Sequence, residues 1–305
     1  MLKRTFPYLR SADVLTILFL SFLCCLEAVF WQRLSQYLYY IPLNLVLIGF
    51  ILYAGKKLSQ SGNGKSLSLS IAFDWYLVPN ILYVYTQASS LAHPLHGRDY
   101  DTILIAVDRW LFGVDPTHWI MQFAHPFITE ILQIAYASYY LFFVALFYEL
   151  YKKKMLAEFE QGALLVVYGF YLSYIGYLLL PAIGPRFTLH DFTSINTDLP
   201  GLFFTPYLRE LINSGGGIVA GVNPALTVHR DAFPSGHTQL TLTAMYVAFA
   251  NKTTIRWGLF VVGSLLIIST IYMQYHYGID VIVGMVLFVF TVWSGKRIHA
   301  WWKRG

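Results

Sequence analysis

Two short polar segments hold the residues whose types and spacing could do chemistry. The first runs from Phe233 to Thr238, reads FPSGHT, and leads directly into an apolar run. Proline and serine suit the start of a helix, glycine lets the backbone approach a ligand closely, and the free amides of a first helical turn attract an anion. We therefore expect a phosphate cradle with His237 at its edge. The alternative is an ordinary helix cap with an interfacial histidine.

The second segment runs from Ser269 to Asp280 and reads STIYMQYHYGID. His276 and Asp280 are four residues apart, so on a helix they share a face, and the carboxylate can accept a proton from one imidazole nitrogen. The other nitrogen then keeps its lone pair, which is the arrangement of an activated nucleophile. Alternatively, the aspartate caps a helix or satisfies a buried histidine. We favour function, because ionisable groups at membrane depth are costly.

A third segment, from Pro181 to Phe187, contains a single arginine in the sequence PAIGPRF. The guanidinium of Arg186 can offer a planar fork of donors to phosphate oxygens. A lone interfacial arginine also serves as a lipid-headgroup anchor. We infer a phosphate-binding role because all three segments are expected on the same face of a membrane.

The elements that must position these residues are membrane helices. Of the 305 residues, 57% are apolar and only 12% are charged, whereas soluble domains carry about 25% charged residues. The apolar residues gather in runs long enough to cross a hydrocarbon core as helices. The sequence therefore predicts an all-α polytopic bundle. We place eight spans, at about 13–31, 37–54, 69–90, 127–150, 163–180, 238–250, 258–275 and 278–294.

The basic residues alternate between the connecting segments. One set of segments holds 15 of the 21 Lys and Arg residues, namely Lys3, Arg4, Arg10, Lys56, Lys57, Lys65, Lys152, Lys153, Lys154, Lys252, Arg256, Lys296, Arg297, Lys303 and Arg304. The positive-inside rule places this set, and both termini, in the cytoplasm. All three polar segments then lie on the extracytoplasmic face, which is periplasmic or lumenal. We attribute the net charge of +5 to this asymmetric distribution of basic residues across the membrane and not to a surface that binds nucleic acid.

The chain is expected to form one membrane domain over 1–305. It divides into N-terminal spans at 1–90, an outer interfacial segment at 91–126, a catalytic helical core at 127–294 and a basic cytoplasmic tail at 295–305. Within the interfacial segment, residues 98–119 mix aspartates with large apolar side chains. This mixture predicts an amphipathic helix lying at the outer interface. The adjacent Cys24 and Cys25 are assigned to packing.

The order of these segments resembles the type 2 phosphatidic acid phosphatase superfamily over roughly residues 180–284. Pro234 to His237 match its second motif in full, and Ser269, His276 and Asp280 match three positions of its third. The resemblance implies a nucleophilic His276 oriented by Asp280 and a general acid at His237. It also implies phosphate contacts from Arg186, Ser235, the Gly236 amide and Ser269.

Three departures from the phosphatase pattern indicate a branch of this superfamily. Leu179, Phe187 and Thr270 stand where the phosphatases usually have Lys, Pro and Arg. The form of the third motif, HYGIDVI, looks like the inositol phosphorylceramide synthase and sphingomyelin synthase branch of inositolphosphotransferase-like enzymes. Fewer cations favour a phosphodiester, which carries one charge, over a nearly dianionic phosphomonoester. Arg230 or His229 could fold back and supply the missing charge.

We therefore predict a lipid phosphotransferase or phosphatase that forms a phosphohistidine, with membrane lipids as substrates and no nucleic acid or required protein partner. No cofactor or metal is expected, because arginine and helix-end amides can stabilise the developing charge. A lipid phosphate phosphatase, of phosphatidate or polyprenyl phosphate type, is the first alternative. A lipid transporter or binding protein with a relic site is the second. The lipid donor, the acceptor and the oligomeric state are left open by the sequence.

Overall fold

The computed structural model describes residues 5–61 and 66–304, and within these ranges the chain forms helices and no strands. The predicted all-helical class is therefore confirmed. Lys3, Arg4 and Lys65, which belong to the charge pattern above, lie outside the described residues. The first half contains α2 (Ser11–Val29), α3 (Tyr40–Gln60), α4 (Leu67–Trp75), α5 (Leu77–His96), α6 (Asp101–Phe112), α7 (Pro116–Ile120), α8 (Pro126–Ala137) and α9 (Tyr139–Lys152).

The second half contains four long helices, one of which lies at the centre of the bundle, and four short helices in loops. Its long helices are α10 (Leu156–Leu179), α15 (Gly236–Ala250), α16 (Arg256–Tyr272) and α17 (Gly278–Arg304), and its loop helices are α11 (Pro185–Thr188), α12 (Ile195–Asp198), α13 (Thr205–Gly215) and α14 (Pro224–Thr227). Helix α10 packs against α2, α5, α15 and α17. Its apolar residues face all directions, as expected of a helix surrounded by others.

All eight apolar runs fall on helices, but fewer than eight of the described helices have the length and composition of a membrane span. Among residues 5–61 and 66–304, four helices are long and apolar enough to cross a membrane, namely α2, α10, α17 and α3 with the short helix before it. Two further pairs qualify if each bent pair counts as one span: α4 with α5, bent by 41°, and α8 with α9, bent by 50°. Helix α16 is apolar but shorter, and α15 has 15 residues. The count of eight stays a prediction.

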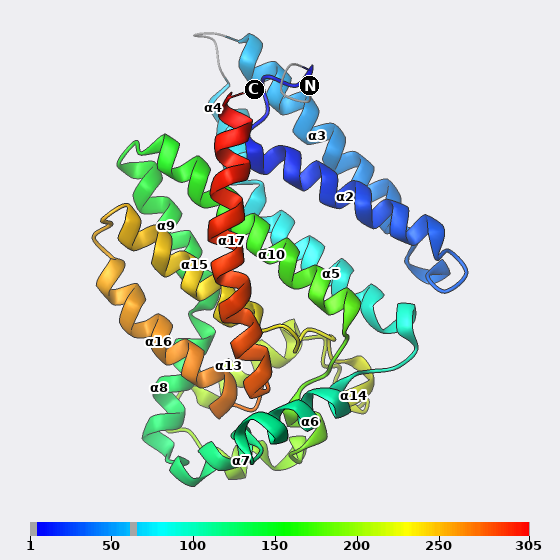
Figure 1. The fold of residues 1–305 in the computed structure, drawn as a ribbon, viewed down its shortest axis with the longest axis vertical. Coiled ribbons are helices and arrows are strands. Elements are labelled where there is room, and N and C mark those ends of the chain that lie inside the picture. Colours follow the sequence, from blue (N-terminus) through cyan, green and yellow to red (C-terminus); the bar gives the residue numbers. More distant parts are fainter. Residues whose placement is uncertain (1–4, 62–65, 305) are drawn as a thin grey trace.

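The chain termini lie at one end of the bundle and the loop helices at the other (Figure 1). Both described chain ends lie at the top of the figure, and α6, α7 and α13 lie at the bottom. Helix α17 begins near the bottom and runs to the top, where it ends close to the N-terminal segment. The motif that precedes α17 is thus at the end opposite the termini. This separation matches the relative arrangement expected from the charge pattern, while the side of the membrane that each end faces stays a prediction.

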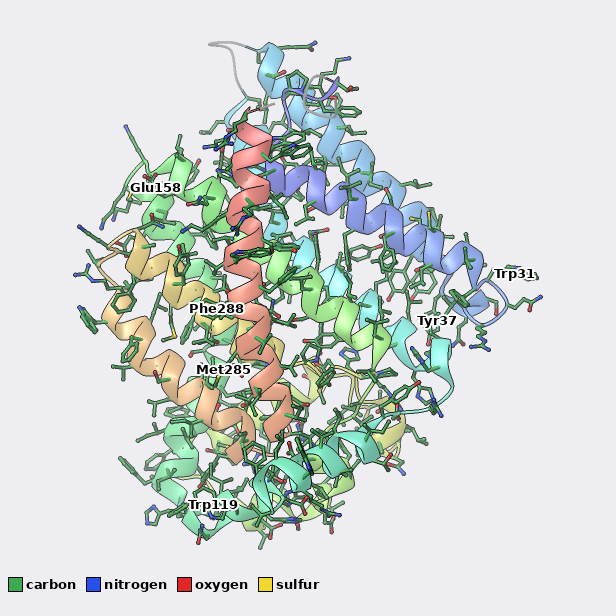
Figure 2. All side chains as sticks on the ribbon, in the orientation of Figure 1. Trp31, Tyr37, Trp119, Glu158, Met285 and Phe288 are labelled. Carbon is green, nitrogen blue, oxygen red and sulfur yellow. The ribbon has the colours of Figure 1, made fainter. Side chains whose placement is uncertain are left out.

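The segment at 98–119 forms two helices, α6 and α7, across the lower end of the bundle (Figure 1). The last turn of α6 ends at Gly113, whose φ of +72° is the left-handed conformation that favours glycine. Trp110 on α6 is 82% exposed, whereas Asp101 and Asp108 on the same helix are buried. Figure 2 shows Trp119 at this lower end and Glu158 toward the opposite end. An aromatic outer face and a buried acidic face make α6 amphipathic, and its place at the membrane interface stays a prediction.

Candidate active site

A cavity of about 450 Å³ lies at the end of the bundle opposite the termini. Its wall comes from α5, α8, α9 and α10, from α13, and from the residues just before or within the first turns of α15 and α17. Among the lining residues are His237, His276, Arg186 and Gly236. Three segments that are far apart in the sequence therefore meet at one cavity.

His276 lies in the turn between α16 and α17, and its side chain is almost fully buried. Its Nδ1 is 2.7 Å from the carbonyl oxygen of Ala232 and 3.5 Å from Oδ2 of Asp280. Both neighbours are acceptors, so we assign the ring proton to Nδ1. Nε2 then carries the lone pair, and it faces Nδ1 of His237 at 3.3 Å. This tautomer is the one that a nitrogen nucleophile requires.

Asp280 approaches His276 differently from the helical pairing that the spacing predicted. Helix α17 begins at Gly278, so His276 precedes the helix and the two residues do not share a helix face. The carboxylate, which has no exposed surface, instead accepts the backbone N–H of Tyr277 at 2.7 Å and lies at ion-pair distance from the imidazole. The carbonyl of Ala232 is the nearer partner of Nδ1. Asp280 therefore fixes the turn that holds His276, as well as facing its ring.

His237 lies in the first turn of α15, and its ring is held by aromatic packing. The ring stacks on Tyr136 with centroids 4.6 Å apart and lies 4.4 Å from the ring of Tyr139. The residue before the helix, Ser235, caps it, because its Oγ accepts the N–H of Thr238 at 3.2 Å. The hydroxyl of Ser235 is fully buried and does not line the cavity.

Gly236 is required by a close approach. A Cβ on this residue would come within 2.5 Å of the Tyr177 hydroxyl and 3.4 Å of Oγ of Ser173. Real Cβ atoms do not approach other atoms this closely, so a larger residue would displace the tyrosine that packs here. Glycine thus lets the first turn of α15 pack against Tyr177 and form part of the cavity wall, and the predicted close approach to a ligand stays a prediction.

Arg186 presents a guanidinium that no carboxylate neutralises. The side chain is 4% exposed, and its cationic carbon lies 4.7 Å from the ring centre of Tyr275 and 4.8 Å from that of Phe192. One terminal N–H group donates to Oδ1 of Asn213 at 2.7 Å, while the buried Nε has no partner. No acidic side chain of residues 5–61 or 66–304 lies within ion-pair distance of it. A buried charge in this condition is set up to bind an anion.

Helix α6 holds the first motif through Asp101. This carboxylate accepts the backbone N–H groups of Ile183 at 3.1 Å and Gly184 at 2.8 Å, and the Tyr277 hydroxyl at 2.8 Å. Gly184 has a φ of +94°, and a Cβ there would lie 2.9 Å from the Tyr275 carbonyl oxygen. The turn that presents Arg186 is therefore fixed by a glycine and by a carboxylate more than eighty residues earlier in the chain.

The same helix holds the third motif through Asp108, seven residues and two helical turns after Asp101. Its two oxygens accept the backbone N–H groups of Gly278 and Ile279, each at 2.7 Å. These are first-turn amides of α17, which an acidic group stabilises. Burial raises the pKa of both carboxyl groups, and the hydrogen bonds from the backbone oppose that rise. Helix α6 thus positions both Arg186 and His276 without lining the cavity itself.

Besides Ser235 and Asp280, three further residues that the sequence singled out do not line the cavity. Ser269 is buried on α16, and its hydroxyl donates to the carbonyl oxygen of Leu266 at 2.6 Å. The guanidinium of Arg230 is held by Asp99 at 3.3 Å and by three backbone carbonyl groups. His229 has its Nδ1 3.0 Å from the hydroxyl of Tyr85, behind the cavity wall. The structure therefore brings neither Arg230 nor His229 to Arg186.

Sequence reasoning missed the tyrosines and the acidic residue that form much of the wall. Six tyrosines of the helices and one aspartate, Asp231, line the cavity; the tyrosines are Tyr85, Tyr136, Tyr139, Tyr140, Tyr174 and Tyr177. They come from three apolar runs in which tyrosine is common, so no spacing marks them. Asp231 directly follows Arg230 in the sequence and could have been noticed as an acidic residue beside the second motif.

The described residues contain no group of three or more His, Cys, Asp or Glu side chains that could hold a metal ion. The charged and polar groups at the cavity are instead two imidazoles, one guanidinium, one carboxylate and hydroxyl groups. Such a set can bind a phosphate ester, attack its phosphorus through nitrogen and move a proton. Independence from metal stays a prediction for experiment.

The chain is similar to known proteins of one superfamily. A family model described as the PAP2 superfamily matches residues 102–294. A PA-phosphatase related-family protein from Dictyostelium discoideum is 23% identical over 185 residues, which cover 55% of this chain and 32% of the relative. The match thus spans about a third of that protein. No solved structure matches the chain at a significant level.

Proposed function

Because this chain belongs to the PAP2 superfamily, a family that points to phosphatase or phosphotransferase chemistry on lipids, we propose that it transfers a phosphorylated headgroup between lipids through a phosphohistidine at His276. The observation that carries the proposal is the cavity in which Nε2 of His276 is free of a proton, beside Nδ1 of His237 and near the unpaired guanidinium of Arg186. Membrane lipids are both the donor and the acceptor of the headgroup.

In the first step, Nε2 of His276 attacks phosphorus and the bond from phosphorus to the departing alkoxide breaks. His237, which carries a proton on each nitrogen once the anionic phosphate is bound, gives one of them to the alkoxide and becomes neutral, and Asp280 with the Ala232 carbonyl stabilises the positive charge on the ring of His276. Arg186 and the amide of Gly236 bind the phosphate oxygens, whose charge grows in the transition state.

In the second step, the hydroxyl of an acceptor lipid attacks the same phosphorus. The bond from phosphorus to Nε2 of His276 breaks, and His237 takes the hydroxyl proton, which returns both rings to their starting states. Water in place of the acceptor would give hydrolysis by the same route. The 3.3 Å contact between the two rings leaves no room for a phosphoryl group between them, so His237 must turn within its tyrosine stack as substrate enters.

A phosphodiester substrate is favoured by the charge of the cavity. Arg186 is the single arginine or lysine among the residues that line the cavity, and a carboxylate, Asp231, lines it too. Arg230 is committed to Asp99 and to backbone carbonyls. One cation suits the single charge of a diester better than the nearly dianionic phosphate of a monoester. This argument favours transfer over the second candidate, a lipid phosphate phosphatase.

The test is product identification with purified protein. Phosphodiester lipids, phosphatidate and polyprenyl phosphates are supplied with and without a lipid acceptor, and the products are identified by mass spectrometry. We expect headgroup transfer to the acceptor, which His276→Ala abolishes and His118→Ala, on the exposed α7, leaves within about twofold. Release of inorganic phosphate from monoesters alone would assign the chain to the phosphatases. Binding of lipid without any turnover would favour the transporter alternative.

The location of the reaction follows from the charge pattern. We propose an integral membrane protein with both termini in the cytoplasm and the cavity at the extracytoplasmic face. In support, the described part of the chain carries several helices that could span a membrane, and the cavity lies at the end opposite the termini. The headgroups of the outer leaflet would then be at the depth of the cavity.

A further inference from the structure

A second hollow lies in the half of the bundle away from the two histidines. It is an open groove of about 580 Å³ between α15 and α17. Figure 2 shows Phe288 midway along α17, and the groove extends from there toward the end of the bundle at which the chain termini lie. Its lining includes four large apolar or aromatic residues and two cations, namely Tyr246, Phe288, Val292, Trp293, Lys296 and Arg297. None of them lines the cavity of His276.

The length and position of the groove fit one leaflet of a membrane. From Phe288 to Arg297, α17 advances about 14 Å, which is close to half of a hydrocarbon core about 30 Å thick. Arg297 lies about 28 Å along the helix from Gly278, where α17 begins. With the turn of His276 at one surface of the membrane, as proposed above, the cations at the end of the groove reach the opposite surface.

Lys296 and Arg297 carry positive charges that no carboxylate balances within the described ranges. No ion pair among residues 5–61 and 66–304 includes either side chain. From residue 232 to residue 305 the sequence has a single acidic residue, Asp280, which faces His276 at the other end of α17. The end of the groove is therefore a positively charged surface.

Aromatic residues of the groove hold both cations at its edge. Nζ of Lys296 on α17 donates to the hydroxyl of Tyr246 on α15 at 2.5 Å. The guanidinium carbon of Arg297 lies 4.2 Å from the ring centre of Trp293, and one of its terminal N–H groups donates to the carbonyl oxygen of that residue at 3.0 Å. Each hydrogen bond uses one donor, whereas an ammonium group has three and a guanidinium five. Both side chains are exposed, so their other donors can bind an anion beside the apolar wall.

We propose that this groove binds one anionic phospholipid of the leaflet at that end of the bundle. An acyl chain lies against Tyr246, Phe288 and Val292, and the phosphate binds Lys296 and Arg297. Basic pockets between membrane helices bind anionic headgroups in this way. A zwitterionic lipid offers the same chains, but its ammonium group would lie beside two cations. By the topology proposed above, the leaflet is the cytoplasmic one, and the site is separate from the reaction at His276.

The charges favour a lipid over a second copy of the chain as the occupant. In a two-fold symmetric dimer the same surface of each copy forms the interface. Lys296 and Arg297 would then face the same two cations of the other copy, and like charges in an interface oppose association. An anionic lipid instead matches the apolar wall with its chain and the cations with its phosphate.

The bound lipid would join the two helices whose first turns lie at the active cavity. A Cβ on Gly284 of α17 would lie 2.6 Å from the carbonyl oxygen of Ser235, so α17 and the start of α15 are in close contact. Farther along, the rings of Tyr246 and Phe288 lie with centroids 6.4 Å apart, and both line the groove. A lipid in the groove contacts both helices, so we expect it to stabilise their packing.

The experiment measures lipid binding to the purified chain in detergent by native mass spectrometry. Phosphatidylglycerol, which is anionic, and phosphatidylcholine, which is zwitterionic, are titrated separately and have identical acyl chains. One Lys or Arg near anionic lipid changes affinity by about fivefold. With two cations, the first phosphatidylglycerol should bind about 10- to 30-fold more tightly than the first phosphatidylcholine. Equal affinity for the two lipids would overturn the proposal.

Charge variants test whether the two cations cause the preference. In the double variant Lys296→Gln with Arg297→Gln, the affinity ratio between the two lipids should fall to near one. Lys57→Gln is the matched control, because Nζ of Lys57 also donates to a tyrosine hydroxyl, that of Tyr53 at 2.9 Å, but does not line the groove. The control should keep the wild-type ratio. A double variant that keeps the wild-type ratio would place the anionic lipid elsewhere and refute the proposal.

A second variant tests the groove while it keeps both cations. Val292→Trp places a large side chain in the groove and should weaken binding of phosphatidylglycerol by about tenfold, the loss expected when two CH₂ groups of the acyl chain no longer fit. Thermal unfolding without added lipid checks that the variant is folded. Unchanged binding would show that the chain does not occupy the groove, and a lipid-free dimer that Val292→Trp separates into monomers would assign the groove to a second copy. Either result would overturn the proposal.

Discussion

Replacing Asp108 with asparagine tests whether α6 holds the catalytic turn. Each oxygen of Asp108 accepts one first-turn amide of α17, from Gly278 and Ile279, at 2.7 Å. Asparagine keeps one acceptor and turns an N–H₂ group toward the other amide. Hydrogen bonds to charged groups contribute about 1.5–3 kcal/mol each, and a buried amide left unpaired costs about 1–3 kcal/mol. We expect local destabilisation of about 2–4 kcal/mol at the turn that follows His276.

The loss should appear in the rate more than in binding. A displacement of about 1 Å at the reacting atom costs on the order of 100-fold in rate, so kcat for Asp108→Asn should fall about 30- to 300-fold. KM should change little, because Arg186 is held by Asp101 and not by Asp108. The assay is steady-state kinetics on purified protein in detergent, with thermal unfolding measured in parallel.

The matched control is Asp115→Asn, which breaks an ion pair with Arg109 on the outer side of the same segment. Surface pairs of this kind contribute little, so kcat should stay within about twofold of the wild type. If Asp108→Asn keeps more than half of the wild-type kcat, or if both variants lose activity equally, the carboxylate does not position His276 and the reasoning fails.

Four further predictions can be checked with the same preparation. Arg186→Lys should raise KM and lower kcat/KM by at least tenfold, because an ammonium group cannot give the planar fork of donors; equal kinetics would remove Arg186 from the phosphate site. His237→Ala should cost about 10²- to 10⁴-fold with an alkoxide leaving group and much less with a nitrophenolate, whereas equal losses would exclude proton donation. Chelators should leave the rate unchanged, and a loss of activity that one metal ion restores would contradict this mechanism. With the native cysteines replaced, a cysteine at Leu226 should react with an impermeant reagent on intact cells while one at Lys153 should not, and the reverse result would invert the topology.

The sequence predicted which motif residues face the cavity better than how they are held there. The positive-inside pattern and the apolar runs placed His237, His276 and Arg186 at one end of the bundle, and in the structure all three line one cavity. The spacing of His276 and Asp280 suggested a shared helix face, but α17 begins between them. A helix start depends on tertiary contacts, here the hydrogen bonds from its first amides to Asp108, which no local pattern contains.

The sequence also predicted phosphate contacts or added positive charge from polar residues whose side chains make other contacts in the structure. Ser235 and Ser269 each direct the hydroxyl to a backbone group within their own segment. The side chain of Arg230 is held by Asp99, 131 residues earlier in the chain. The aromatic wall was missed for the opposite reason, since tyrosines such as Tyr85 and Tyr139 occur in apolar runs where no motif or spacing marks them. Only the packing of the helices decides which of their faces meets the cavity.

The contacts of α6 have a consequence for the order in which the chain is made. Asp101 and Asp108 are synthesised before the segments they hold, which are the turn at Gly184 and the start of α17 at Gly278. During translation the acidic face of α6 has no partner until the chain beyond α10 emerges, and its second partner arrives only with the start of α17. A chain cut between α9 and α10 would therefore leave the anchoring carboxylates on one fragment and both histidines of the cavity on the other. Activity would require the two fragments to reassemble.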